Sequence, residues 1–352
     1  MGRMSGFPSI PQTVFAAWSL DPASVQALGS GLINHSLLVR DRAGTPRVLQ
    51  QVNPMFPPAV NEDIEAVTTH LAAAGLDTPR LVRTRDGALC LPATGGAWRL
   101  LSYMPGRVLD ALENPAQARA AGRLLARFHR ALDDLEHEFR HVRPPVHGPA
   151  RHLASLRESL ANHAGHRLHG EASTLAETIF AAARALPALP ETPPRVVHGD
   201  PKISNLVFED GRDVAVCMLD LDTVGRMPLP FELGDAFRSW CNAVTEDDPR
   251  GRFSPELFEA AVGGYGEAAR GWLLPAEAAA VVCATATIQV ELAARFCADS
   301  LNESYFGWNP AAFSSRGEHN LARARGQLAV HRSLLGQYER LEALASRALA
   351  GG

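Results

Sequence analysis

The chain has 352 residues, of which 46% are hydrophobic and 20% charged, a balance typical of globular proteins and not of disordered tails or fibres. Its length favours two lobes, each able to bury a core of its own. The net charge of −4 argues against a nucleic-acid partner, because phosphate backbones are bound by clusters of basic side chains.

The first hundred residues predict a small lobe of strands with one helix. Short runs of branched and aromatic residues, separated by turn-forming residues, indicate the strands. The predicted strands comprise residues 25–31, 33–42, 47–52, 80–85, 88–91 and 98–104. One helix is expected from an N-cap at Asn61 to a stop at Gly75, because apolar residues between them recur at helical spacing. Pro105-Gly106 ends the last strand, so the first lobe comprises residues 1–104.

Residues 105–352 predict a larger lobe made mainly of helices. Apolar residues recur at helical spacing in residues 118–135, 150–160 and 174–186, and helical patterns fill the C-terminal part. A compact β segment interrupts the helices, with a strand at 195–197, a polar loop and a hairpin around Asp210-Gly211. The predicted fold class is therefore α+β.

The termini and cysteines indicate a cytoplasmic protein with no membrane partner. Residues 1–12 contain two prolines and no long apolar stretch, unlike a signal peptide. The longest apolar run, residues 278–288, is too short to cross a bilayer. The five cysteines form no C-x-x-C pair, which argues against a disulfide framework or a zinc site.

The densest cluster of reactive side chains lies in the β segment. His198-Gly-Asp-Pro-Lys-Ile-Ser-Asn205 is followed, after an apolar strand, by Asp220-Leu-Asp222. A hairpin with a solvated turn is the alternative interpretation, but turns seldom combine these residue types. We expect His198 to hold this loop structurally, and Asp235, near the start of a later helix, to anchor the loop backbone.

This cluster contains the groups that phosphoryl transfer requires. The reaction needs a carboxylate that accepts the nucleophile's hydrogen bond, oxygen ligands for Mg²⁺, and positive charge at the transferred group. Asp200 is the candidate base, Lys202 the candidate cation, and Asn205 and Asp220 are candidate metal ligands. Asp222 either binds a second Mg²⁺ or forms hydrogen bonds beside Asp220. Lys202 is also the only lysine in the sequence, which suits a site that needs a compact ammonium group.

H-x-D-x-K-x-x-N followed by D-L-D resembles the catalytic and metal-binding loops of the kinase-like superfamily that includes aminoglycoside phosphotransferases and choline kinases. Further segments are similar to those of N-acetylhexosamine 1-kinases, at residues 29–36, 48–53, 62–71, 217–224, 231–238, 291–296 and 319–327. The resemblance implies a bilobal protein-kinase-like fold, with an antiparallel sheet and one helix in a small nucleotide-binding lobe. It also implies a larger, mainly helical lobe for catalysis and substrate binding, and an enzyme that uses ATP and Mg²⁺.

The same resemblance implies further contacts to the ligands. Nucleotide contacts are expected from Gly29, Ser30, Gly31, Gln50, Tyr103 and Met104. Arg295 is expected near the substrate. No Gly-Lys-Ser/Thr follows the glycines, which excludes a Walker-type phosphate loop and suits the kinase arrangement.

Gln50 departs from the usual kinase pattern. The third strand of kinases normally carries a lysine that pairs with a helix glutamate and reaches the nucleotide phosphates. Gln50 supplies no charge, as in the N-acetylhexosamine kinases, so phosphate binding must depend on Lys202, the metal or an arginine. Either Glu62 or Glu65 is the expected partner on the helix.

Two other classes of function compete with a kinase. Asp220-Leu-Asp222-Thr223 also fits the D-x-D-x-T motif of aspartyl-nucleophile phosphatases, but the helical remainder of the chain does not suit their alternating β and α units. A pseudokinase, which binds nucleotide without turnover, is favoured by Gln50 and disfavoured by the complete catalytic set. Among kinases, we expect the acceptor to be the anomeric hydroxyl of an N-acetylhexosamine-like sugar. An aminoglycoside, choline or another amino alcohol is the alternative acceptor.

Overall fold

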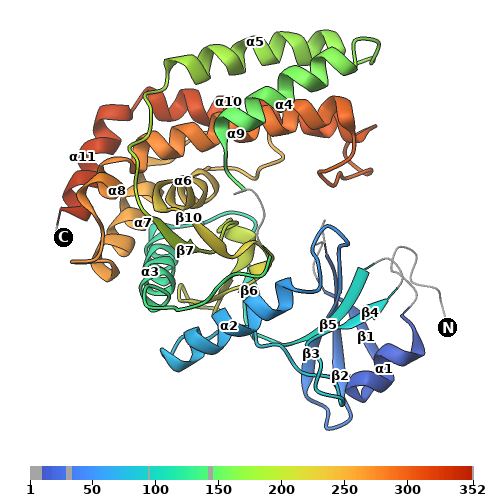
Figure 1. Ribbon diagram of the computed structural model, residues 1–352. Coiled ribbons are helices and arrows are strands. Elements are labelled where there is room, and N and C mark those ends of the chain that lie inside the picture. The colour runs from blue at the N-terminus through green and yellow to red at the C-terminus, as the bar shows by residue number, and fades with distance from the viewer. Residues whose placement is uncertain (1–9, 29–33, 94–95, 142–145, 351–352) are drawn as a thin grey trace. The chain divides into compact units, whose positions relative to one another are not determined.

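The computed structural model describes residues 10–28, 34–93, 96–141 and 146–350 (Figure 1). The chain forms two compact units, the first comprising Met1–Pro105 with Leu135–Arg143 and the second Gly106–Asp134 with Pro144–Gly352. The predicted α+β class is confirmed, because the N-terminal part contains an antiparallel sheet and the C-terminal part is mainly helical.

Unit 1 is built on a five-stranded antiparallel sheet with strand order β1-β2-β3-β5-β4. The strands are β1 (Leu20–Ala27), β2 (His35–Asp41), β3 (Pro46–Val52), β4 (Leu91–Ala93) and β5 (Gly96–Ser102). Side chains of a strand alternate between its two faces, and one face of this sheet buries apolar residues against helix α1 (Gln12–Trp18). Leu49 belongs to that apolar core, so its neighbour Gln50 lies on the opposite face.

The structure corrects several predicted elements of the first lobe. Helix α1 lies where the sequence analysis expects no element. Residues 80–85 are no full strand, since they meet β5 through the single bridge between Leu81 and Leu101. The Thr84 N–H then donates to the Ala88 carbonyl in a tight turn, so β4 begins only at Leu91.

Helix α2 (Val60–Ala73) ties a later segment to unit 1 through Asp63. Its buried carboxylate accepts hydrogen bonds from the backbone N–H groups of Arg140 at 2.7 Å and His141 at 2.8 Å, and lies 2.8 Å from His137 Nε2. Leu135–Arg143 therefore belongs to unit 1, whereas the sequence analysis places this segment in the second lobe. This contact could not be predicted from the sequence, because a carboxylate that accepts hydrogen bonds from a distant segment produces no periodic pattern of residues.

Replacing Asp63 with alanine is expected to destabilise unit 1 by about 2–4 kcal/mol, because two partly buried backbone N–H groups lose a buried carboxylate acceptor. Unfolding in urea measures the loss, and hydrogen exchange should accelerate at the amides of Arg140 and His141. Asp86→Ala is the matched control, since Asp86 lies exposed in a turn of the same unit and its removal should leave both measurements unchanged. Protected amides in Asp63→Ala would contradict the prediction.

Unit 2 is mainly helical and carries two small sheets, with strand orders β6-β8-β9 and β10-β7. Its strands are β6 (Arg107–Val108), β7 (Pro194–Val197), β8 (Leu206–Phe208), β9 (Ala215–Met218) and β10 (Gly225–Pro228). Its helices are α3 (Pro115–Ala131), α4 (Pro149–Asn162), α5 (His169–Ala185), α6 (Leu229–Trp240), α7 (Pro255–Ala268), α8 (Pro275–Ala279), α9 (Val281–Asn302), α10 (Arg316–Leu335) and α11 (Tyr338–Leu349).

Helix α9 is the central helix of unit 2 and contacts α4, α5, α6 and α10 (Figure 1). By length and composition it could cross a membrane, but 94% of its most apolar window is buried within the protein. A helix that is apolar all round and covered on all sides is a core helix. Its contacts to α6 matter for the site, because α6 supports the loop between β7 and β8.

Candidate active site

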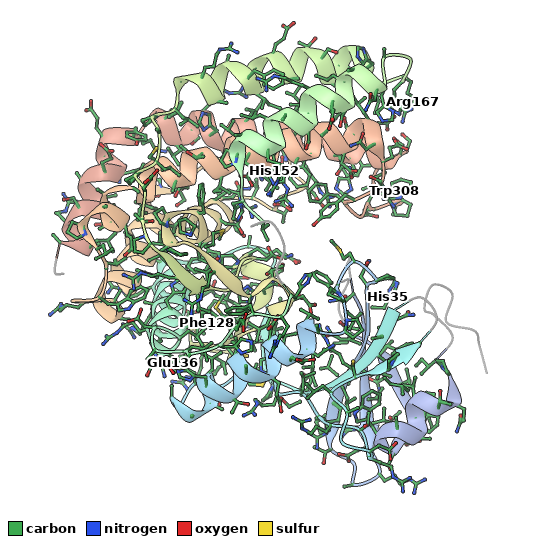
Figure 2. The ribbon with its side chains drawn as sticks, in the orientation of Figure 1. His35, Phe128, Glu136, His152, Arg167 and Trp308 are labelled. Carbon is green, nitrogen blue, oxygen red and sulfur yellow. The ribbon has the colours of Figure 1, made fainter. Side chains whose placement is uncertain are left out.

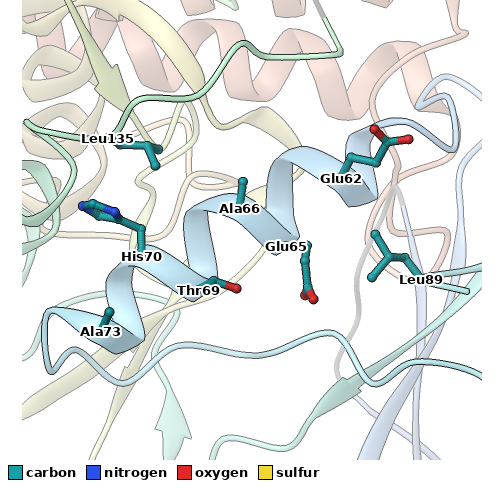
Figure 3. A pocket seen from close by; sticks show the side chains of 8 residues that line it. All are labelled: Glu62, Glu65, Ala66, Thr69, His70, Ala73, Leu89 and Leu135. Atoms are coloured by element: carbon teal, nitrogen blue, oxygen red, sulfur yellow. The ribbon is translucent and has the colours of Figure 1, made fainter. Parts of the chain in front are cut away.

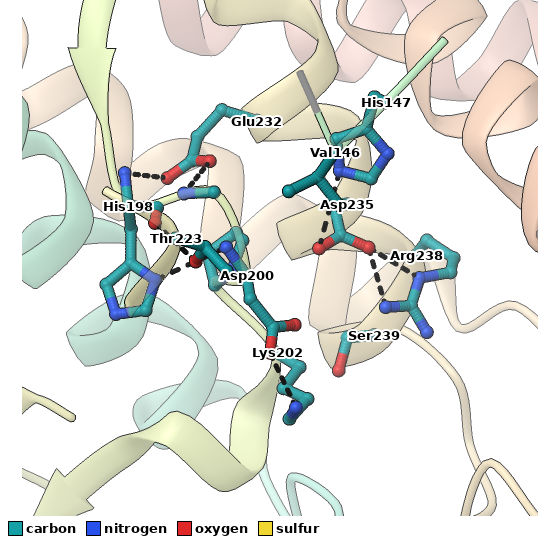
Figure 4. Close-up of polar contacts among 12 residues, drawn as sticks. Val146, His147, His198, Asp200, Lys202, Thr223, Glu232, Asp235, Arg238 and Ser239 are labelled. Atoms are coloured by element: carbon teal, nitrogen blue, oxygen red, sulfur yellow. Dashed lines mark hydrogen bonds and ion pairs between the residues drawn. The ribbon is translucent and has the colours of Figure 1, made fainter. Parts of the chain in front are cut away.

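The hairpin of β8 and β9 and the pairing of β7 with β10 bring the predicted loop, residues 198–205, next to the end of β9. β8 pairs antiparallel with β9, and the Leu219 N–H donates to the Asn205 carbonyl at 2.7 Å. His198 Nε2 lies 2.7 Å from the Leu219 carbonyl, and Thr223 Oγ1 donates to the His198 carbonyl at 2.8 Å (Figure 4). His198 thus holds the loop against the strand end, in the structural role expected for it.

Asp200 is the centre of a hydrogen-bonded group within this loop. Lys202 Nζ donates to Asp200 Oδ2 at 2.6 Å, and Asn205 Nδ2 donates to the same oxygen at 3.2 Å and to the Asp200 carbonyl at 2.8 Å. Burial opposes ionisation of Asp200, but the Lys202 ammonium outweighs it and lowers the pKa of the carboxyl. The Asp200 side chain is 26% exposed, so an ionised carboxylate is accessible to a ligand.

Asp220 stands in a different electrostatic environment. Burial, together with the neighbouring charge of Asp222, raises its pKa to about 7. Its backbone adopts the left-handed conformation, with φ 60° and ψ 60°, which costs of order 1 kcal/mol or more in a non-glycine residue. Backbone strain at Asp220 and electrostatic repulsion between Asp220 and Asp222 are typical of a site that a bound ligand stabilises.

These residues fit a hard divalent cation. Asp222 is buried and Asp220 partly buried, and two neighbouring carboxylates repel each other unless a cation lies between them. Asn205, at the end of the neighbouring loop of residues 198–205, offers an amide oxygen. In the part of the chain that the structure describes, no three His, Cys, Asp or Glu side chains gather as a metal site. A site with Asp220, Asp222 and Asn205 therefore leaves positions for water and phosphate oxygens, which is how Mg²⁺ is commonly bound.

Glu232, on the first turn of α6, anchors the loop of residues 198–205 through its side chain. Its fully buried carboxylate accepts hydrogen bonds from the backbone N–H groups of His198 and Gly199, both at 2.9 Å (Figure 4). His129 Nε2 lies 3.4 Å from the same carboxylate. Burial opposes ionisation of Glu232, but His129 and the other donors outweigh it and lower its pKa.

The loop also requires glycine at position 199. Gly199 has a φ of +85°, and a Cβ there would lie 2.4 Å from the Thr223 carbonyl oxygen. Beside it, the ring of Phe128, a buried residue of α3, lies 5.9 Å from the His198 ring (Figure 2). The conformation that presents Asp200 is thus fixed by backbone, carboxylate and aromatic contacts together.

Asp235 does not have the anchoring role expected for it. It accepts hydrogen bonds from Arg238, at 2.6 Å from Nη2 and 3.0 Å from Nε, and lies 3.8 Å from His147 Nε2. Arg238 also donates to Glu246 at 2.6 Å. The loop N–H groups are instead bound by Glu232, which lies one helical turn closer to the N-terminus of α6.

Replacing Glu232 with glutamine is expected to destabilise unit 2 by about 2–4 kcal/mol, because an amide N–H₂ would then face a backbone N–H donor. Thermal unfolding measures the loss. Glu256→Gln changes a 66%-exposed side chain on α7 and serves as the control that should unfold like the wild type. Equal stability of the two variants would show that Glu232 does not hold the loop.

Unit 1 places the remaining candidates as follows. Gln50 on β3 donates from Nε2 to Ser36 Oγ at 2.9 Å and accepts from Arg99 Nε at 2.8 Å. Tyr103 and Met104 follow β5 directly and are half-buried. The predicted glycine turn, made of Gly29, Ser30 and Gly31, lies outside the described residues. All six nucleotide contacts stay predictions.

Both candidate helix glutamates face an open hollow of about 510 Å³ along α2 (Figure 3). The hollow is lined by Glu62, Glu65, Ala66, Thr69, His70, Ala73, Leu89 and Leu135. Glu65 accepts from Arg83 at 2.9 Å, and Glu62 is largely exposed. The described hydrogen bonds of Gln50 go to neither glutamate.

Arg295 lies among aromatic side chains that follow α9. Its guanidinium carbon is 5.6 Å from the ring centre of Phe306 and 5.9 Å from that of Tyr305. One turn earlier, the Glu291 carboxylate lies 2.9 Å from His147 Nδ1 and accepts from the Gly148 N–H. Polar contacts thus connect Glu291 on α9 with His147, which in turn lies near Asp235 on α6. Substrate contact by Arg295 stays a prediction.

Comparison with known families supports the chemistry of this loop. The model of the phosphotransferase enzyme family matches residues 24–276, which is more than half of the chain and includes every candidate residue from Gly29 to Asp222. The chain belongs to the phosphotransferase enzyme family.

Solved structures of similar fold align with 90% or more of this chain. An amicoumacin kinase in complex with AMP-PNP, Ca²⁺ and Ami has a TM-score of 0.61 and 15% identity, with 90% of this chain and 91% of that chain covered. An aminoglycoside phosphotransferase from Alicyclobacillus acidocaldarius has a TM-score of 0.61 and 18% identity, with 96% and 99% covered. A microcompartment-associated aminopropanol kinase has a TM-score of 0.59 and 16% identity, with 95% and 98% covered. At these identities the likeness shows the shared kinase-like fold.

Two residues of this phosphotransferase family member are important in the structure and absent from the predicted set. Glu232 holds the loop of residues 198–205, and Arg99 donates a hydrogen bond to Gln50. For Arg99 the sequence contains a signal, because one arginine interrupts the apolar strand Gly96–Ser102, and a charge in a buried strand needs a partner. Glu232 has no comparable signal, since Glu is common in the first turn of any helix.

Proposed function

We propose that this chain transfers the γ-phosphoryl group of ATP to a hydroxyl of a small molecule, with Mg²⁺ as the metal. The observation that carries the proposal is the hydrogen-bonded group of Asp200, Lys202 and Asn205 beside the strained carboxylate pair of Asp220 and Asp222. Membership of the phosphotransferase enzyme family supports the reaction class.

In this mechanism Asp200 accepts the hydrogen bond of the acceptor hydroxyl and takes its proton as the oxygen bonds to the γ-phosphorus of ATP. The bond from that phosphorus to the bridging oxygen breaks, and ADP leaves. The low pKa of Asp200 keeps the carboxylate ionised for this purpose. Lys202, whose ammonium is held by Asp200 at 2.6 Å, supplies positive charge near the transferred group. Asp220, Asp222 and Asn205 would hold Mg²⁺, which when bound neutralises the phosphate oxygens of the nucleotide.

For the acceptor we propose a sugar, in particular the anomeric hydroxyl of an N-acetylhexosamine. The motif resemblance along the chain supports this choice. Arg295 adds to it, because a guanidinium can donate to an acetamido carbonyl, and the adjacent Tyr305 and Phe306 offer rings of the kind that pack against sugars.

An amino alcohol or aminoglycoside is the second candidate, since structures of similar fold are named as aminoglycoside and aminopropanol kinases. A cationic acceptor is best bound by carboxylates whose negative charge is not already paired with a basic side chain of the protein. Asp247, on the segment after α6, already pairs with Arg323 at 2.7 Å and lies 2.9 Å from His319. Asp247 therefore has less charge available for a cationic acceptor, and the motif resemblance is the reason for preferring the sugar.

The test is an acceptor panel with the full-length protein, ATP and Mg²⁺, in which ADP release is followed and products are identified by phosphorus NMR. The panel contains N-acetylglucosamine, N-acetylgalactosamine, their 1-O-methyl glycosides, kanamycin, choline and aminopropanol. We expect turnover with the free sugars and none with the methyl glycosides, whose anomeric oxygen is blocked. Turnover only with the amines would replace the sugar by the second candidate. ATP binding without transfer to any acceptor would instead favour a nucleotide-binding module.

A further inference from the structure

The last turn of α6 contacts the backbone on both sides of Lys202. Trp240 Nε1 donates to the Pro201 carbonyl at 2.8 Å, and the Ile203 N–H donates to Ser239 Oγ at 3.1 Å. Trp240 is fully buried, and a buried indole N–H normally has a hydrogen-bond partner. Helix α6 therefore supplies a hydrogen-bonding partner to each of the two peptide groups that flank Lys202.

These two contacts restrain the direction in which the Lys202 side chain leaves the backbone. The Pro201 carbonyl belongs to the peptide plane before Lys202, and the Ile203 N–H belongs to the plane after it. The second plane is restrained again, because the Lys202 carbonyl accepts from the Asn205 N–H at 2.9 Å. Only φ and ψ of one residue can rotate between two peptide planes, so restraining both planes fixes the Cα–Cβ bond of Lys202.

A lysine needs such restraint more than a shorter side chain does. Its ammonium is a point charge at the end of a flexible four-carbon stem, and ordering that stem costs conformational entropy. Lys202 Nζ donates to Asp200 Oδ2 at 2.6 Å, while the Lys202 side chain is 36% exposed (Figure 4). One hydrogen bond at the far end does not fix where the stem begins, and the contacts from α6 supply this.

The same helix also holds the part of the loop before Asp200. Glu232, on the first turn of α6, accepts from the backbone N–H groups of His198 and Gly199. The backbone on both sides of Asp200 is thus bound to one helix, at its first turn and at its last. The position of the Lys202 ammonium relative to the Asp200 carboxylate therefore depends on α6.

We propose that Ser239 and Trp240 are positioning residues for phosphoryl transfer, which hold the Lys202 ammonium where it meets Asp200 and the transferred group. The inference rests on the proposed function, in which Lys202 supplies positive charge to that group. Both residues act through the backbone of Lys202. A cation that is fixed in advance stabilises a transition state better than one that must be ordered during the reaction.

The first test compares kcat with the KM for ATP, on the full-length protein with Mg²⁺ and the best acceptor of the panel. Trp240→Phe keeps an aromatic ring but loses the indole N–H, and Ser239→Ala loses the hydroxyl acceptor. Each should lower kcat about tenfold and leave KM within a few-fold, because the ammonium acts most strongly in the transition state. Ser239→Thr keeps a hydroxyl and should keep most of the activity.

Trp18→Phe is the matched control for loss of an indole hydrogen bond. Trp18 Nε1 donates to the Val82 carbonyl at 2.7 Å, and Trp18 is also buried, in the apolar core of unit 1. The substitution removes the same kind of hydrogen bond from a different part of the chain. It should destabilise the protein by a similar amount and leave kcat unchanged.

The second test observes the Lys202 side chain directly by NMR. Lys202 is the only lysine in the chain, so labelled lysine reports on this side chain alone. With ¹³C at Cε, the two ε protons give separate signals when the stem is held in one conformation. We expect separate signals in the wild type and in Trp18→Phe. In Trp240→Phe and Ser239→Ala the two signals should move together, because the stem gains rotational freedom.

The outcomes separate the inference from the proposed function. If the wild type transfers phosphate and both Trp240→Phe and Ser239→Ala do so at an unchanged rate, only the inference fails. Loss of activity with unchanged lysine signals would show an effect that does not pass through Lys202, and it also overturns the inference. Wild-type ε protons that already share one signal would show that the stem is not held, with the same consequence.

If Trp240→Phe does not fold, the comparison of Ser239→Ala with Ser239→Thr decides by both measurements. A wild-type protein that transfers no phosphate to any acceptor overturns the proposed function and this inference together.

Discussion

Replacing Asp200 with asparagine is expected to lower kcat roughly a thousandfold, because the side chain keeps its size but can no longer take the acceptor's proton. ADP release in the presence of Mg²⁺ and the best acceptor of the panel measures the loss. ATP affinity should stay within a few-fold of wild type, since the nucleotide contacts are assigned to other residues. Asp210→Asn, in an exposed turn, is the matched control and should be fully active.

The same variant separates the competing classes of function. An aspartyl-nucleophile phosphatase with its nucleophile at Asp220 would keep hydrolysing phosphate esters after Asp200→Asn. A pseudokinase would show no difference from wild type, because neither protein would transfer phosphate. Full kinase activity of Asp200→Asn would remove Asp200 from the mechanism.

Replacing Asp220 with asparagine is expected to abolish Mg²⁺-dependent transfer, with a loss of about a thousandfold, because the main carboxylate ligand becomes a neutral amide. The raised pKa of Asp220 also predicts that binding of the metal depends on pH. Without metal, Asp220 has a pKa raised to about 7 by burial and by Asp222, so near neutral pH a proton must leave when the metal binds. Affinity for the metal should therefore rise as the pH increases through about 7.

Calorimetric Mg²⁺ titrations at pH 7, in buffers of different ionisation enthalpy, count the protons that are released. Wild-type protein should release a fraction of one proton, and Asp220→Asn should release none from this position. Asp213→Asn, a partly exposed carboxylate that contacts Gln117, is the control. Unchanged proton release in Asp220→Asn would assign the titrating group elsewhere.

Asp200 and Asp220 have carboxyl groups whose pKa values shift in opposite directions. The Lys202 ammonium lowers the pKa of Asp200 despite burial. Burial and the neighbouring charge of Asp222 raise the pKa of Asp220. Different environments allow neighbouring carboxyl groups to take different roles, and the roles of base for Asp200 and of metal ligand for Asp220 stay predictions.

Gln50 takes on a different meaning once its partner is known. As an uncharged residue in a lysine position it was the best support for a pseudokinase. Its hydrogen bonds to Ser36 on β2 and Arg99 on β5 give the side chain a structural role within the sheet, which is compatible with an active enzyme.

The sequence by itself determined the fold class, the order of most elements and the main reactive loop. Strand alternation, helical spacing and the H-x-D-x-K-x-x-N motif are local features, so they can be recognised without coordinates. The family match over residues 24–276 agrees with that motif-based assignment. Local signals failed at residues 80–85, where branched residues suggested a strand and a tight turn prevailed.

Only the tertiary structure decided which distant side chains support the site. Glu232 rather than Asp235 holds the loop, Asp63 binds a segment more than seventy residues away in sequence, and Arg99 lies directly opposite Gln50. Each of these depends on how strands pair and how helices rotate against them. The physical reason is that burial and hydrogen bonding between distant segments determine these contacts, and neither has a fixed spacing along the chain.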